Sequence, residues 1–252
     1  MAGADIARAA AALVQARRTR QWLDLLPDGC RPTDLSEAYA IQEQVIRALG
    51  PVAAWKVGAG NPQATPSCAP IVATTLFEDG ARLSSASLNV IGVEVEIAYR
   101  FARDLPCGEE PFRRDEVLAA IGSVQPAVEI SDSRYAVWNS QDRLSQVADQ
   151  LNHGALIVGP GRSDWAAIDA ATQAARLTLN GALAAETAGG HPAGDVFRLL
   201  HWLANEGARP FGGLKAGCVV TTGSCTGVIF VKPPMHVLAE LPGLGRVSLD
   251  IE

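Results

Sequence analysis

Cysteine and histidine are scarce in this chain of 252 residues, and their spacing narrows its class. The five cysteines are odd in number and form no Cys-x-x-Cys pair, so neither a disulfide framework nor a zinc knuckle is expected. The four histidines have no metal-ligand spacing either. This cysteine usage favours a reducing compartment, and we therefore expect a cytoplasmic protein.

Long hydrophobic runs and an excess of positive charge are also absent. No stretch approaches the ~18 apolar residues of a membrane-spanning helix. The Ala-rich start is interrupted by Asp5, Arg8 and Arg17, so it lacks the apolar run of a signal peptide. The formal net charge of −6 argues against nucleic acid or an anionic membrane as the main partner. A small anionic substrate stays compatible, because one local cation can outweigh a diffuse negative field.

The chain does have enough apolar residues, 48% of the total, for one large core. Its first part predicts a helical arm over 1–50, with one helix over 4–26 and a second that starts after Asp34 and ends at Gly50. The remainder, 51–252, predicts a β-rich catalytic domain with short helices over 115–121 and 195–205. Strands are expected over 53–57, 90–101, 123–130, 154–158, 177–183, 218–222, 227–231 and 246–251. Because βαβ alternation is not sustained, we predict an α+β fold with a mixed, mostly antiparallel β-roll or barrel.

The strand expected over 90–101 carries the most informative pattern. Side chains alternate across a strand, so Val93, Val95 and Ile97 should face one way, with Glu94 and Glu96 facing the other. Two like charges on a buried face repel each other and lose hydration unless a cation lies between them. The alternative is that both glutamates line a solvated face of an antiparallel sheet.

A third carboxylate, Glu129, lies in a similar apolar run over 127–130. Three carboxylates with room for waters and a chelating substrate suit a hard cation such as Mg²⁺ or Mn²⁺. The sequence pattern therefore indicates a candidate metal site at Glu94, Glu96 and Glu129.

Two further segments are candidates for substrate contact. Lys56 ends an apolar strand just before Gly58, where it could bind a carboxylate or move protons, or simply reach solvent. The Gly/Ser/Thr segment over 221–227 offers backbone N–H groups and hydroxyls, including those of Thr222 and Ser224, to an anion. A simple hairpin turn is the more common outcome for such a segment. Asp79, in a Glu-Asp-Gly string, is most simply a turn aspartate.

Taken in order, these pieces resemble the 2-keto-4-pentenoate hydratase family of the fumarylacetoacetate hydrolase superfamily. The matching strings include AWKVGAG at 54–60, GVEVEIAYRFARDLP at 92–106, AVEISDSR at 127–134, NHGALIVG at 152–159 and LKAGCVVTTGSCTG at 214–227. The specific part is the Glu-x-Glu pair followed about 30 residues later by a glutamate in a VEI-x-D-x-R string.

The resemblance implies a metal held by Glu94, Glu96 and Glu129, with a chelated 2-oxo acid. It implies that Lys56 takes part in proton transfer or substrate binding, with Asp79 as a second catalytic candidate. It also implies the β-roll of the superfamily's C-terminal type and favours a homo-oligomer, with association with another enzyme of the pathway as an option.

The expected function is a Mg²⁺- or Mn²⁺-dependent hydratase that adds water to a 2-hydroxy-2,4-dienoate and gives a 4-hydroxy-2-oxo acid. Such chemistry belongs to the meta-cleavage catabolism of aromatic compounds. One alternative is a decarboxylase of a vinylogous 2-oxo diacid of the 4-oxalocrotonate type, which needs the same electron sink. An alternative of another class is a non-catalytic subunit that supports an active partner.

Overall fold

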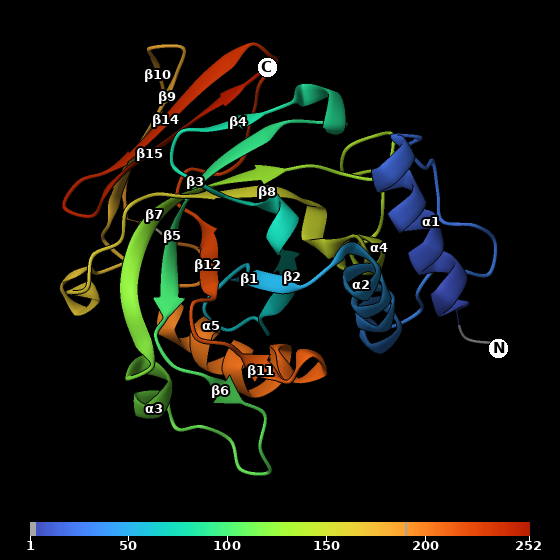
Figure 1. The fold of residues 1–252 in the computed structure, drawn as a ribbon, viewed down its shortest axis with the longest axis horizontal. Coiled ribbons are helices and arrows are strands. Elements are labelled where there is room, and N and C mark those ends of the chain that lie inside the picture. Colours follow the sequence, from blue (N-terminus) through green and yellow to red (C-terminus); the bar gives the residue numbers. More distant parts are fainter. Residues whose placement is uncertain (1–3, 190) are drawn as a thin grey trace.

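The computed structural model describes residues 4–189 and 191–252, and the chain begins with two packed helices (Figure 1). These are α1 (Ile6–Thr19) and α2 (Leu35–Leu49), capped by the side chains of Asp5 and Asp34. The first helix is shorter than the 4–26 predicted from the sequence. It ends at Thr19 because Arg20 adopts a left-handed conformation, with φ 61°, and caps the helix through its backbone N–H.

An eight-stranded sheet forms the centre of the molecule and is mostly antiparallel. Its strands in spatial order are β2 (Ser67–Val72), β1 (Val52–Gly58), β12 (Val219–Ser224), β5 (Gly92–Phe101), β7 (Ile121–Ser131), β8 (His153–Val158) and β3 (Leu76–Glu78), and β13 (Ile229–Phe230) also pairs with β5. Only the β1–β12 and β3–β8 pairs of this sheet are parallel. Strands β2 and β3 are additions to the elements expected from the sequence.

A second, five-stranded sheet packs against β7 and β8 (Figure 1). Its order is β10 (Ala182–Ala188), β9 (Ala174–Leu179), β14 (Met235–Leu241), β15 (Gly245–Ile251) and β4 (Ala81–Leu83). The single strand predicted over 177–183 is wrong. Asn180 and Gly181 both have positive φ and form a two-residue hairpin turn, which splits that segment between β9 and β10.

Short helices and one minor ribbon complete the architecture. These are α3 (Arg114–Leu118), α4 (Arg143–Ala148), α5 (Val196–Trp202), which continues as a π-helical turn (Leu203–Gly207), and the strand pair β6 (Leu105–Pro106) with β11 (Gly213–Leu214). The helix α4 was not expected from the sequence. No helix in the described residues is long and apolar enough to cross a membrane.

The two faces of the large sheet differ in what they bury. One face contributes Trp55, Val95 and Val220 to the main core, which also includes the second sheet and α5. The other face carries a separate cluster that includes Ala54, Ile71, Ala98 and Leu156. The predicted α+β class with mostly antiparallel pairing is confirmed. Over the described residues neither sheet closes on itself, so the barrel option does not apply.

The helical arm has a small core of its own. Leu13 of α1 and Val45 of α2 pack in a cluster that also takes Tyr135 and Ala148 from the rest of the chain. The arm therefore packs against the segment that follows β7 and against α4, close to the turn that leads into β8 (Figure 1). This placement matters for the site described next.

Candidate metal and active site

Three glutamates lie together on the face of the large sheet that also carries Ala54 and Ala98. Glu94 and Glu96 alternate with core residues along β5, as predicted, and Glu129 of β7 is the cross-strand partner of Glu94. Glu96 and Glu129 are 3% and 1% exposed, and Glu94 is half-buried. The structure therefore gathers the three carboxylates instead of exposing them on a solvated face.

Lys56 of β1 reaches the same place and is the cation nearest to these carboxylates. Its Nζ lies 2.6 Å from Glu129 Oε1 and donates a second hydrogen bond to the carbonyl oxygen of Leu151, at 3.0 Å. The Lys56 side chain is 14% exposed, so the strand-end lysine turns inward. We call Glu94, Glu96, Glu129 and Lys56 the glutamate site.

Each carboxylate also accepts a hydrogen bond from a neighbouring strand or turn. The Ser131 hydroxyl donates to Glu94 at 2.7 Å, and the backbone N–H of Gly223 donates to Glu96 at 3.0 Å. The ring of His153 lies 3.1 Å from Glu129 Oε1 through Nδ1. Glu129 Oε2 is buried and has no hydrogen-bond partner among the described residues.

The electrostatics of the glutamate site follow from this crowding. Burial, reinforced by Glu129 and Glu94, raises the pKa of Glu96 to about 8, and burial with Glu129 nearby also raises the pKa of Glu94. Burial alone would raise the pKa of Glu129, but Lys56 and His153 outweigh it and hold that pKa low. Burial would lower the pKa of Lys56, yet Glu129 and Glu94 raise it, so its ammonium stays protonated.

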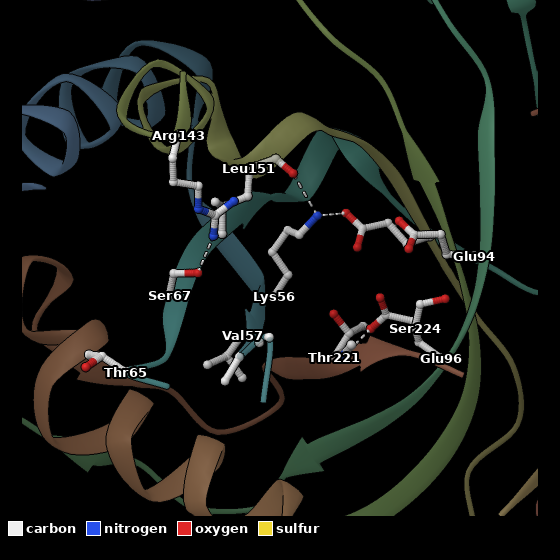
Figure 2. A pocket seen from close by; sticks show the side chains of 15 residues that line it. Lys56, Val57, Thr65, Ser67, Glu94, Glu96, Arg143, Leu151, Thr221 and Ser224 are labelled. Carbon is white, nitrogen blue, oxygen red and sulfur yellow. Dashed lines mark hydrogen bonds and ion pairs between the residues drawn. The ribbon is translucent and has the colours of Figure 1, made fainter. Parts of the chain in front are cut away.

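The glutamate site opens into a cavity of about 550 Å³ (Figure 2). Of the residues predicted from the sequence, the structure brings six to this cavity, namely Lys56, Gly58, Glu94, Glu96, Glu129 and Ser224. Their backbone elements β1, β5, β7 and β12 are neighbours in the sheet, which explains how positions far apart in the sequence converge.

The structure places Thr222 and Asp79 outside the cavity lining. Alternation along β12 turns Thr221 toward the cavity and Thr222 away from it, where its hydroxyl donates to the carbonyl of Ile97. Asp79 is exposed and accepts hydrogen bonds from the backbone and hydroxyl of Ser248 on the second sheet. Asp79 therefore acts as the turn aspartate of the simpler interpretation.

Several cavity features were not foreseen from the sequence. The Leu151 carbonyl belongs to a turn in which Gln150, Leu151 and Asn152 all have positive φ, at 52°, 52° and 60°. Such a run is costly for residues other than glycine, so it needs support from its surroundings. Arg143 of α4 and Ser67 of β2 line the cavity too. No local pattern indicates these positions, because they arrive through the packing of α4 and β2.

The donor set fits a hard divalent cation, although the side chains as they stand do not form a closed ligand cage. No group of three or more His, Cys, Asp or Glu side chains in the described chain is arranged to hold a metal ion. The reason is visible in the contacts, since Glu129 is turned to Lys56 while Glu94 and Glu96 bond to Ser131 and Gly223. Carboxylate oxygens are the ligands that Mg²⁺ and Mn²⁺ prefer. Glu129 Oε2, which has no hydrogen-bond partner in the described part of the chain, is one carboxylate oxygen available to a metal ion. The other carboxylates would have to turn away from their present hydrogen-bond partners to bind the ion.

Comparison with known proteins shows the family of the chain. The profile of the fumarylacetoacetate (FAA) hydrolase C-terminal family matches residues 50–252, so the chain belongs to that family. A 2-keto-4-pentenoate hydratase from Paraburkholderia phymatum is 28% identical over 94% of each chain. A 2-hydroxyhexa-2,4-dienoate hydratase from Comamonas testosteroni is 32% identical over 69% of this chain and 66% of its own length.

The relatives also include decarboxylases. A 4-oxalocrotonate decarboxylase from Pseudomonas sp. strain CF600 is 31% identical over 68% of this chain and 63% of its own. The solved structure of 4-oxalocrotonate decarboxylase from Pseudomonas putida G7, complexed with magnesium and adipate, has the same fold, with a TM-score of 0.84 at 24% identity and coverage of 98% and 97%. Hydratases and decarboxylases are both lyases, the class of enzyme expected from the sequence.

Proposed function

We propose that this protein is a divalent-metal-dependent lyase that adds water to a 2-hydroxy-2,4-dienoate and produces a 4-hydroxy-2-oxo acid. The observation that carries the proposal is the glutamate site, in which three carboxylates and one ammonium face a cavity from one side of the sheet. The named hydratases among the relatives, one of them similar over nearly the full chain, support this choice.

Glu94, Glu96 and Glu129 would hold Mg²⁺ or Mn²⁺ beside the cavity. The ion would supply Lewis-acid stabilisation of negative charge at the 2-oxygen of the bound acid. Gly223 and Ser131 keep Glu96 and Glu94 oriented through hydrogen bonds, so these carboxylates are held near the cavity before any ligand arrives.

Lys56 is our candidate for the residue that moves protons on the substrate. An ammonium has three N–H donors, and two of them point to Glu129 and Leu151, which leaves the third for a ligand in the cavity. Because Glu129 and Glu94 raise the pKa of Lys56, it begins as a proton donor. Its role is therefore that of a general acid first and a base afterwards.

The proton steps balance as follows for this residue. Lys56 donates a proton to C5 of the dienol and takes up the proton that the 2-hydroxyl releases, which gives a 2-oxo-3-ene. Water then forms a bond to C4 through its oxygen. One O–H bond of that water breaks, and its proton is delivered to C3. The overall change is the addition of one water molecule, and the lysine ends in its starting state.

Decarboxylation of a vinylogous 2-oxo diacid is the second candidate, because decarboxylases of that kind are also among the relatives. It would use the same stabilisation of charge at the 2-oxygen and would differ in breaking a carbon–carbon bond. A non-catalytic subunit is a third interpretation, and turnover by the isolated protein would contradict it. Homo-oligomeric assembly stays a prediction from the family resemblance, for light scattering to check.

The decisive experiment is an assay of the purified protein with a panel of 2-hydroxydienoates and vinylogous 2-oxo diacids. The protein is first freed of metal by chelation and then supplied with Mg²⁺ or Mn²⁺. We expect loss of the dienol absorbance only when the ion is present, with a 4-hydroxy-2-oxo acid as product. Equal turnover in verified metal-free protein would contradict the metal role, and CO₂ release would select the decarboxylase.

A further inference from the structure

The cavity has a second cation, Arg143, whose partner is not a carboxylate of the protein. Arg143 is the first residue of α4 and lines the cavity together with the glutamate site. Its Nη2 donates to the Ser67 hydroxyl at 2.7 Å. Figure 2 shows the Arg143 side chain pointing toward Ser67, across the cavity from Glu94 and Glu96.

The charges around the cavity leave this guanidinium without an ionic partner. Lys56, the other cation of the lining, is paired with Glu129. Asp142, the neighbour of Arg143 in the chain, pairs with Arg31 at 2.9 Å. No ion pair of Arg143 occurs among residues 4–189 and 191–252, although its Nη2 is oriented by Ser67. A guanidinium fork offers two parallel N–H donors that match a carboxylate.

The strand positions of Lys56 and of Ser67, which orients Arg143, lie close together in the sheet. Ser67 of β2 pairs with Gly58 of β1, and Lys56 lies two residues before Gly58 on the same strand. Two residues of a strand cover about 7 Å at a rise of ~3.3 Å per residue. An acid whose 2-oxo end lies at Lys56 and the glutamates therefore has its far end near Arg143.

We propose that Arg143, oriented by Ser67, binds a second carboxylate of the substrate, so that the enzyme's substrate is a dicarboxylic 2-hydroxydienoate. This inference rests on the proposed function, which supplies the head-group site for the first carboxylate. It adds the chemical group at the far end of the substrate's carbon chain, which neither the glutamates nor Lys56 determines.

The position of Arg143 also bears on the reaction. In decarboxylation of a vinylogous diacid the far carboxylate leaves as neutral CO₂, and a cation paired with it stabilises the substrate more than the transition state. In hydration the far carboxylate keeps its charge throughout, so the ion pair with Arg143 persists from substrate to product. The subsite therefore favours hydration of a diacid in which the second carboxylate lies beyond C5.

Two unreactive probes separate the head group from the far end. 2-Oxohexanoate and 2-oxohexanedioate have the same 2-oxo acid end and the same number of carbons, and differ in a methyl or a carboxylate at C6. We would titrate each into the Mn²⁺-loaded protein by calorimetry. The wild type should bind the diacid up to about fivefold more tightly, the upper range for an ion pair with an exposed arginine such as Arg143. That preference should shrink as salt is added.

Variants then assign the preference to one side chain. Arg143→Gln should weaken binding of the diacid by that same factor and leave the monoacid unchanged, and Arg143→Lys, which keeps the charge but loses the fork, should fall between. Arg162→Gln is the matched control, because Arg162 is a surface arginine paired with Asp164 and does not line the cavity. It should keep the full preference of the wild type.

The possible failures are distinguishable. Equal affinity of the wild type for both probes, or a preference that persists in Arg143→Gln, would overturn the Arg143 subsite and leave the proposed hydratase untouched if dienoates are turned over. Failure of both probes to bind the Mn²⁺-loaded protein, together with no turnover of any dienoate, would overturn the proposed function and with it the subsite.

Discussion

Compared with the glutamate site, the neighbouring buried cluster around Arg134 holds similar groups in a balanced arrangement. Arg134 is 1% exposed, and its guanidinium bonds to Asp149 and Asp132 and to three backbone carbonyl oxygens. Arg17 of the helical arm reaches the same region and donates to Gln150 and to the carbonyl of His153. The charges of two cations and two carboxylates therefore balance in this cluster. The N–H donors of the Arg134 guanidinium all have hydrogen-bond acceptors.

In the glutamate site, by contrast, the number of carboxylates exceeds the number of cations. Its three carboxylates face one ammonium, burial raises the pKa of two of them, and one carboxylate oxygen of Glu129 has no partner among the described residues. A buried polar group without a partner costs free energy that a purely structural cluster avoids. The balanced cluster therefore compensates its charges within the fold, whereas the unbalanced one leaves charge uncompensated, as we expect of the proposed metal site.

The two clusters are connected through the turn at 150–152. The carbonyl of His153 accepts from Arg134 and Arg17, while its ring bonds to Glu129, and burial lowers the pKa of that ring to about 4. The left-handed residues of the turn present the Leu151 carbonyl to Lys56. The balanced cluster thus supports the turn at 150–152, which orients Lys56.

The largest expected effect is on stability and tests the structural cluster. Arg134→Met would leave Asp132 and Asp149 buried without their cation, which should lower the free energy of unfolding by about 3–5 kcal/mol. Urea denaturation measures it, and Arg134→Lys should recover part of the loss. An unchanged unfolding midpoint would show that this cluster is not structural.

At the glutamates we expect a loss of metal binding without a loss of folding. Glu94→Gln or Glu129→Gln should weaken Mn²⁺ binding by more than ~100-fold, since loss of a direct ligand should exceed the 10–100-fold cost of losing an outer-shell partner. Turnover should fall in parallel, while the metal-free protein still folds. Titration calorimetry and steady-state assays measure these effects. Wild-type metal affinity in both variants would place the ion elsewhere.

Lys56 should affect chemistry and leave metal binding alone. Lys56→Met should lower kcat on the order of 10²-fold, the scale of a general acid or base. If Lys56 only anchors the acid, KM should rise and kcat should be largely kept. Lys56→Arg separates these roles, because arginine keeps the charge but does not release a proton near neutral pH. Normal kcat and KM in Lys56→Met would return this residue to a structural role.

A smaller effect concerns the pH dependence of the metal-free protein. The folded state holds the Glu96 proton up to about 8, whereas an ordinary glutamate releases it near 4.5, so the folded state binds more protons within that window. Below 6.5 the lowered pKa of His153 opposes this contribution, so wild-type stability should fall with rising pH mainly between 6.5 and about 8. Glu96→Gln should flatten this slope in thermal unfolding curves. A steeper slope in Glu96→Gln would contradict the raised pKa.

The smallest effect is expected on the outside of the helical arm. Arg18 is exposed and its only hydrogen-bond partner among the described residues is the carbonyl of Ala48, so Arg18→Gln should leave kcat, KM and assembly unchanged. Arg17→Gln, by contrast, removes support from the turn at 150–152 and should lower stability. Loss of turnover in Arg18→Gln with intact assembly and metal binding would show that the arm takes part in catalysis.

The sequence alone determined the features that depend on local periodicity. Alternation along β5 placed Glu94 and Glu96 opposite the core, and the cap at Asp34 marked where the second helix starts. Each of these follows from residues within a few positions, where strand pleating and helix geometry leave few choices. The same reasoning missed the turn at Asn180, although an Asn-Gly pair between apolar residues is itself a strong local signal for a two-residue hairpin.

Only the tertiary structure decided which groups meet at the cavity. Lys56 and Glu129 are 73 positions apart, and Lys56 and Leu151 are 95 apart, so their contacts exist only because β1, β12, β5 and β7 are neighbours in one sheet. The approach of Arg143 to Ser67 depends likewise on how α4 packs on β2. Local preference sets the direction of a side chain, but the partner it meets is set by the pairing of strands distant in the sequence.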